Sequence, residues 1–308
     1  MKHLHDISHG GVVWVNVTKQ GEKELREIQQ RFGLLEPDIK ESLPPFQRPK
    51  IVKRGSYYFL VLQWPVFDRD SRKLGFTEVD FFLSGQFLLT VHDGKLVPLG
   101  EFFAECAKGA TARANYFAGT AAHLLLELLS RLLDSIFPIL LHVNDDITRV
   151  DRMLFRKLPP RELAEEILRL KTNTVTFRRT MQGHRLVLDR LIRYAGRELD
   201  LGSYQHYLND LREFAGEIWQ MLESQKESIN ALHETSESLL AMRTNEIMKT
   251  LTIIAVLTFP LTLLATVLAV RARGTPLVGW PGGFWIILAL VILGAGGMLG
   301  LFKKKGWL

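Results

Sequence analysis

The side chains best suited to ion chemistry lie near the end of the 308-residue chain, inside an apolar stretch. Steps of three and four from Asn245 trace one stripe along a helix, and its members are Asn245, Met248, Thr252, Ala255, Phe259, Thr262, Thr266 and Ala269. Hydroxyl and amide groups can hydrogen-bond the water shell of a cation. Apolar side chains contributed by several helices around a pore can close it by excluding water. Alternatively, the threonines bond back to carbonyls of their own helix and the small residues serve helix packing.

Other reactive residue types do not form a catalytic arrangement. His184 and His206 have no metal-ligand partner at a useful spacing, and Cys106 has no evident base. We interpret the histidines at positions 3, 5 and 9 as part of a flexible tail. No glycine-rich loop stands between a strand and a helix at the spacing that a nucleotide phosphate needs. The sequence therefore indicates neither an enzyme nor a bound organic cofactor.

The formal net charge of +6 does not indicate nucleic-acid binding. Basic residues alternate with acidic ones through the N-terminal part of the chain, which is typical of a solvated surface. Asp145 and Asp146 are read in the same way, because adjacent helical positions point apart. The single cysteine excludes an intramolecular disulfide and fits a reducing cytosol.

Two apolar runs are long enough to cross a bilayer. Residues 248–270 are interrupted only by Lys249, and residues 284–302 carry no charge. At about 1.5 Å per residue each run reaches roughly the 30 Å of a hydrocarbon core. Basic residues flank the ends away from the short loop, at positions 243, 249 and 303–305, whereas the loop has Arg271 and Arg273. This asymmetry predicts a cell (inner) membrane protein with both termini in the cytoplasm.

The remaining pattern predicts an α+β organisation. Val12–Val17 reads as a strand, Gly21–Phe32 as an amphipathic helix, and residues 57–66 and 79–91 as strands. Leu124–His142 and Arg161–Arg197 read as the two helices of a hairpin, separated at Pro159 and Pro160.

A third helix begins near Tyr204 and continues without a breaker into the first membrane span. Its apolar residues follow heptad spacing, with polar gaps at Gln225 and Ser236, so a coiled-coil stalk is expected. The expected segments are an α/β domain (1–117), a helical hairpin (118–203), a stalk (204–247), a first span (248–270), an external loop (271–283), a second span (284–302) and a basic tail (303–308).

Several motifs resemble the CorA family of magnesium and divalent-cation channels. They are Thr244-Asn245-Glu246-Ile247-Met248-Lys249, Phe259-Pro260-Leu261-Thr262, the closing Lys303-Lys304-Lys305-Gly306-Trp307-Leu308 and, near the N-terminus, Gln47-Arg48-Pro49-Lys50. The resemblance implies a funnel-shaped homopentamer with a cytosolic N-terminal α/β domain. It also implies that the first span lines a central pore, with Asn245 as an inner polar ring, Met248 and Leu251 near an apolar gate, and Thr262 as a hydroxyl ring.

The family's Gly-Met-Asn signature is missing from the outer end of the pore helix. Aligned without gaps from Pro260, the three positions are Ala269, Val270 and Arg271, and the loop carries arginine where the family usually has acidic residues. Three interpretations of Arg271 and Arg273 stay open at this outer mouth. The arginines slow cation entry, or snorkel outward to lipid headgroups, or favour anions.

The resemblance further implies a regulatory cation site between neighbouring copies. Asp210 matches one carboxylate of that site, and Asp68, or else Asp70, is the expected partner. Mg²⁺ is therefore expected both as transported and as regulatory ion. The predicted function is a pentameric channel for metal cations with altered selectivity, and its partners are metal cations, the lipid bilayer and further copies of the chain. The alternative is a CorA-like membrane scaffold or regulator that conducts no ion or selects weakly among ions.

Overall fold

The fold is described from a computed structural model covering residues 3–156, 159–198, 204–270 and 282–306. The chain divides into two compact units, Met1–His233 and Glu234–Leu308, which are described separately. The first unit contains a six-stranded sheet in the order β1-β2-β6-β5-β4-β3. Its strands are β1 (Leu4–His9), β2 (Val12–Val17), β3 (Lys50–Lys53), β4 (Tyr58–Asp68), β5 (Lys73–Leu83) and β6 (Phe87–His92).

Strand β1 corrects the expectation of a flexible N-terminal tail. It pairs antiparallel with β2, from Leu4 opposite Val17 to His9 opposite Val12. The two residues between the strands, Gly10 and Gly11, have φ angles of 58° and 83°. A two-residue hairpin turn with positive φ at both positions matches the twist of the strands, and glycine adopts it without steric cost. β2 in turn pairs parallel with β6, and the other neighbouring strands pair antiparallel.

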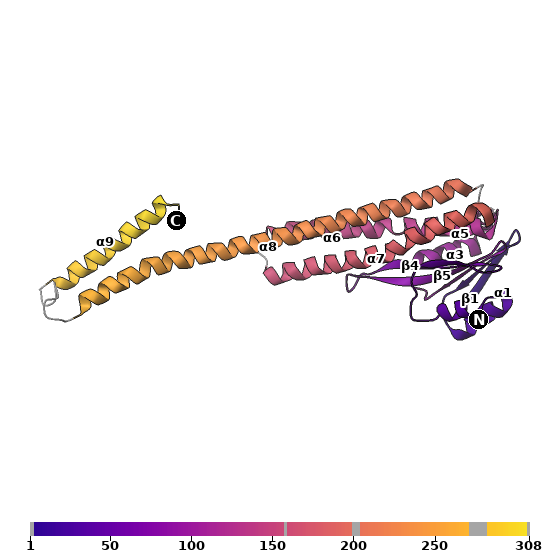
Figure 1. Cartoon of the computed structure of the whole chain (residues 1–308), viewed down its shortest axis with the longest axis horizontal. Helices are drawn as coiled ribbons and strands as arrows, with labels where there is room; N and C mark the ends of the chain where they lie inside the picture. The colour runs from indigo at the N-terminus through magenta and orange to yellow at the C-terminus, as the bar shows by residue number, and fades with distance from the viewer. Residues whose placement is uncertain (1–2, 157–158, 199–203, 271–281, 307–308) are drawn as a thin grey trace. The chain divides into compact units, whose positions relative to one another are not determined.

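Helices cover both faces of the sheet. On one face, α1 (Glu22–Phe32) and α2 (Glu36–Glu41) pack Leu25, Ile28 and Ile39 against Phe59 and Phe82. The other face contributes buried aromatic side chains such as Trp14, Trp64 and Phe81, which pack with later helices. These are α3 (Val97–Lys108), α4 (Ala110–Tyr116), α5 (Ala121–Asp134), α6 (Phe137–Leu154) and α7 (Pro160–Glu198). Figure 1 shows α1 on the opposite side of the sheet from α5 and α7.

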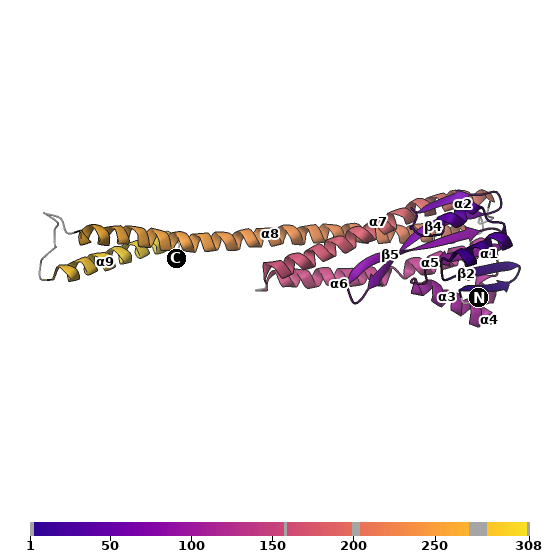
Figure 2. The same cartoon turned by 90° about the horizontal axis from the view of Figure 1, so that it is seen from below.

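The predicted hairpin of two helices is made of three. The segment expected as one helix over 124–142 is interrupted after Asp134, and α6 starts at Phe137 with Pro138 in its first turn. Proline has no N–H and its ring clashes with the carbonyl four residues earlier, which ends the preceding helix. α6 and α7 then run side by side, and the β4–β5 hairpin extends along them (Figures 1 and 2).

Helix α8 (Gln205–Ala269) is continuous over 65 residues and contains Pro260. In the first unit its Leu208, Leu211, Ile218 and Leu222 join the large core cluster. The polar gap at Gln225 has a structural reason, because its side chain is buried and donates from Nε2 to the carbonyl of Leu140 on α6 at 2.8 Å. In the second unit, α9 (Gly283–Lys304) has Gly294 close to Leu261 of α8.

Ionisable groups are buried inside the first unit. Glu78 and Asp80, on one face of β5, are 1% and 0% exposed. Burial raises the pKa of Glu78 to about 7 despite a hydrogen bond from the Gln47 N–H, and burial and the neighbouring Glu78 raise the pKa of Asp80 well above its usual range. Cys106 on α3 is a free, fully buried thiol whose pKa burial raises to about 11.

Candidate ion pathway and regulatory site

The predicted pore stripe lies on the second-unit part of α8. Two helices of the described residues, α8 and α9, are long and apolar enough to cross a membrane. Met248, Leu251 and Phe259 are 55%, 57% and 74% exposed in the single chain, and Asn245, Thr252, Thr262 and Thr266 are exposed as well. α9 approaches α8 at Leu261, so most of the stripe is left uncovered and is available to face other copies.

The threonines of the stripe bond back to their own helix. Thr252 donates to the carbonyl of Met248 at 2.8 Å, Thr262 to Thr258 at 2.8 Å, and Thr266 to Thr262 at 2.6 Å. A hydroxyl has one proton and two lone pairs. Once the proton is given to the helix, the oxygen offers its surroundings only acceptor lone pairs. A threonine can therefore hydrogen-bond its own helix and still accept a hydrogen bond from a hydrated ion, so the two interpretations given above do not exclude each other.

Pro260 changes the hydrogen bonding of α8 where the stripe passes it. Because proline has no N–H, the carbonyl of Val256 lacks its usual donor four residues on. The outer end of the stripe is only partly described: Val270 is 57% exposed, while Arg271 and Arg273 and the side chain of Ala269 lie outside the described residues.

The proposed regulatory carboxylates occupy a turn and a helix start. Asp68, the last residue of β4, accepts hydrogen bonds from the Ser71 hydroxyl at 2.7 Å and the Asp70 N–H at 3.0 Å, and these bonds lower its pKa. Asp210, near the start of α8, lies 3.7 Å from His206 Nε2. Among the described residues of one chain, no hydrogen bond or ion pair joins Asp68 or Asp70 to Asp210, and no group of three or more His, Cys, Asp or Glu side chains could hold a metal.

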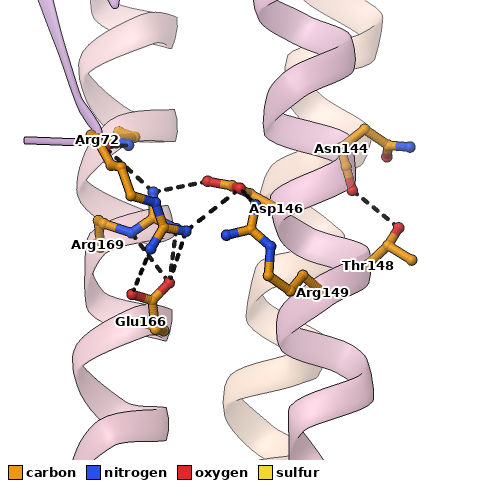
Figure 3. A network of polar contacts seen from close by, with 8 residues as sticks. Arg72, Asn144, Asp146, Thr148, Arg149, Glu166 and Arg169 are labelled. Carbon is orange, nitrogen blue, oxygen red and sulfur yellow. Dashed lines mark hydrogen bonds and ion pairs between the residues drawn. The ribbon is translucent and has the colours of Figure 1, made fainter. Parts of the chain in front are cut away.

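A polar network that sequence reasoning missed joins the β4–β5 turn to α6 and α7 (Figure 3). Its centre is Asp146, which is 2% exposed, so the reading of this residue as surface was wrong. Asp146 contacts Arg149 on its own helix, Arg169 Nη1 of α7 at 2.8 Å and Arg72 Nη2 of the turn at 3.6 Å. A signal was available, because Asp146 lies three residues after Val143 and four before Val150, both buried on the inner face of α6.

Glu166 completes this network. It accepts from Arg72 at 3.1 and 3.3 Å and from Arg169 Nη2 at 2.8 Å. Burial alone would raise the pKa of Glu166, but the two guanidinium groups outweigh it and hold the pKa below its usual value. Asn173 donates to the carbonyl of Arg72 at 2.9 Å and accepts from the Leu74 N–H at 3.0 Å. These contacts hold Arg72 at a φ of 54°, which non-glycine residues adopt rarely.

Comparison with known proteins agrees with this architecture. A family model described as "CorA-like Mg2+ transporter protein" matches residues 9–304. The cobalt/magnesium transport protein CorA of Thermotoga maritima is 27% identical over 301 residues, covering 96% of this chain and 83% of its own. The solved CorA magnesium transporter of Methanocaldococcus jannaschii superposes with a TM-score of 0.84 at 21% identity, over 99% of this chain and 95% of its own. The full-length CmaX protein superposes with a TM-score of 0.74 at 19% identity, over 96% of this chain and 89% of its own.

An N-terminal α/β unit is followed by a long helix that continues into an apolar segment and by a second apolar helix, the arrangement of a protein with two candidate membrane spans. Because the family model spans nearly the whole chain, the chain belongs to the CorA family of Mg²⁺ transporter proteins. The resemblance noted in the motifs is thereby confirmed.

Proposed function

We propose that the chain forms a homopentameric, funnel-shaped channel that passes hydrated divalent metal cations, Mg²⁺ among them, across the cell membrane. The family match over residues 9–304 carries this proposal. Both termini lie in the cytoplasm, and the Asn245–Ala269 stripe of α8 lines the pore.

The hydroxyl chemistry of the stripe supports a cation over an anion. Water molecules around a cation point their hydrogens outward, so they need acceptors from the pore wall. Thr252, Thr262 and Thr266 give their own protons to helix carbonyls and present acceptor oxygens. A hydrated anion would instead require donors, which these rings do not offer.

Loss of the Gly-Met-Asn signature alters selectivity in this proposal. Thr266 is then the outermost hydroxyl ring of the stripe, five residues before Arg271. The Asp68 turn and Asp210 of a neighbouring copy hold a regulatory Mg²⁺, because two facing carboxylates repel each other unless a hard cation bridges them.

Ion flux into liposomes that contain the purified protein tests the proposal, with Mg²⁺, Ni²⁺, Na⁺ and Cl⁻ compared. Divalent flux should exceed that of empty liposomes. Thr266→Val should lower it roughly fivefold, the effect of about one lost hydrogen bond. Thr250→Val is the matched control, because Thr250 also donates to its own helix, at 3.0 Å to Glu246, but lies roughly 160° around the helix from Thr266.

Arg271→Asn, run beside these variants, should raise divalent flux if the arginine ring opposes cation entry. Flux of Cl⁻ alone would contradict the cation assignment. Absence of flux for every ion in the wild type and the Arg271 variant would instead mean that the fold serves a non-conducting membrane scaffold.

A further inference from the structure

A cavity of about 720 Å³ opens in the first unit beside the β4–β5 turn. Its walls come from the end of β4 and the turn, from residues 95–98 at the start of α3, and from residues 135–149 around α6. The volume lies within the range of about 300–1,000 Å³ typical of small-molecule sites. Four lining side chains are basic, Arg69, Arg72, Lys95 and Arg149, and none is acidic.

The network of Figure 3 neutralises part of this charge, but not all of it. The guanidinium groups of Arg72 and Arg149, which line the cavity, and of Arg169, which does not, surround the two carboxylates of Asp146 and Glu166, so three positive charges meet two negative ones. One positive charge is left over within these five residues, and Glu162 and Glu165 line a neighbouring pocket together with Arg72 and Arg149.

The rim adds two more basic groups. Lys95 pairs with Asp93 at 2.8 Å and is 67% exposed. Arg69 has no ion pair among the described residues; its sequence neighbours Asp68 and Asp70 offset part of its charge but do not line the cavity. Asp68 is already engaged by the Ser71 hydroxyl and the Asp70 N–H within the turn. The acidic partners of these groups lie outside the lining, so the surface that faces the cavity carries basic side chains and no acidic ones.

Arg149 has hydrogen-bond donors to offer a ligand. Among the described residues its one partner is Asp146, contacted through Nη2, and its side chain is 48% exposed. A guanidinium carries five N–H donors in a planar fork that matches phosphate or carboxylate oxygens. Arg149 can therefore keep its bond to Asp146 and donate to an anion in the cavity.

The rest of the wall is apolar and partly aromatic. Phe67 and His142 meet edge to face at 4.9 Å between ring centroids, and Ile139 and Val97 extend the apolar surface. We propose that this cavity binds a phosphorylated small molecule with an aromatic part, of the size of a nucleoside diphosphate. The phosphates are held by arginine side chains, not by a glycine-rich loop, and the ring lies on the apolar wall.

Titration calorimetry of the full-length protein in detergent, with ADP, pyrophosphate and adenosine as probes in magnesium-free buffer, tests this proposal. ADP should bind once per chain and more tightly than either fragment. Arg149→Gln should weaken ADP binding about tenfold or more. Val97→Glu should have a similar effect, since it places a negative charge at the rim, where Val97 is 62% exposed, and leaves every ion pair of Figure 3 in place.

Arg161→Gln is the matched control, because Arg161 is 90% exposed on α7, pairs with Glu165 and is not part of the cavity wall. It should leave ADP affinity unchanged. No saturable binding of ADP or pyrophosphate at about 1 mM would overturn the proposal. So would equal ADP affinity in Val97→Glu and the wild type, a loss in Arg161→Gln as large as in Arg149→Gln, or pyrophosphate binding as tight as ADP.

Discussion

Asp146 is a buried charge whose ion pairs hold parts of the fold together. A carboxylate removed from water is tolerated only when it is paired and hydrogen-bonded. Three guanidinium groups from the β4–β5 turn, α6 and α7 supply that pairing. Adjacent helical positions point apart, so Asp145 is exposed while Asp146 points inward, and the prediction that both lie on the surface is wrong for Asp146.

Asp146→Asn should destabilise the protein by about 3 kcal/mol, the lower end of the range for removing one partner of a buried ion pair. Arg72 and Arg169 would keep Glu166, and Arg149 would lose its carboxylate partner. Thermal unfolding of the purified protein in detergent should show a midpoint lowered by several degrees. Asp145→Asn, one residue away on the exposed side of α6, should change the midpoint little. Equal losses in both variants would contradict the central place of Asp146.

Glu78 should make stability fall with rising pH. Its pKa is raised from 4.5 to about 7 in the folded protein, so between those values the folded state holds a proton that the unfolded state has released. The wild type should therefore lose on the order of 2 kcal/mol from this group between pH 5 and pH 8. Glu78→Gln cannot ionise and should lack this contribution over the same interval.

The comparison between variants reports on Glu78 together with its neighbour Asp80, whose pKa Glu78 helps to raise. Burial lowers the pKa of both His92 and His184 to about 4, which makes stability fall as the pH drops from 6.5 toward 4, the opposite slope. Both histidines are unchanged in the variant, so their contribution cancels. Glu22→Gln, at a side chain 73% exposed, is the control. A pH dependence of Glu78→Gln identical to that of the wild type would refute the assignment.

At the scale of elements, sequence periodicity predicted the strands and helices that pack one face against a single surface. β2, α1 and the uninterrupted α8 were expected from their patterns and are found. β1 was missed because its burial is weak, with only Ile7 buried, and its place depends on the Gly10–Gly11 turn. The break between α5 and α6 was missed because the apolar residues continue across it, although Pro138 marked it.

Gly183 tests how closely α7 must approach the loop before β3. A Cβ at this position would overlap the ring of Pro49 in the Gln47–Lys50 motif. Gly183→Ala should therefore destabilise the protein by roughly 1–3 kcal/mol through overpacking. Gly216→Ala on α8 meets no atom within 4 Å and should stabilise by up to about 1 kcal/mol through helix propensity. Thermal unfolding of the two variants, with opposite signs expected, provides the check.

At the scale of the whole molecule, composition predicted two apolar helices and the family motifs predicted the fold. The candidate pore and the regulatory site could be predicted only as positions along α8 and the β4–β5 turn. In the proposed pentamer both sites depend on contacts between copies of the chain. The spacing of residues along one sequence does not reveal contacts between two copies. The cavity beside Arg149 was also unpredictable, because its walls come from three separate segments, residues 65–72, 95–98 and 135–149, that only tertiary packing brings together.

The buried thiol of Cys106 has a practical consequence for counting those copies. The thiolate is the species that reacts with maleimides, and with a pKa of about 11 it represents about one part in ten thousand at pH 7. The wild-type chain, whose single cysteine is Cys106, should therefore react very slowly with a maleimide dye and needs no cysteine removed before site-specific labelling. A thiol introduced at an exposed position of α8, as in Ser228→Cys, would be the one thiol that reacts with a maleimide dye. The number of photobleaching steps of a single labelled particle would then give the number of subunits.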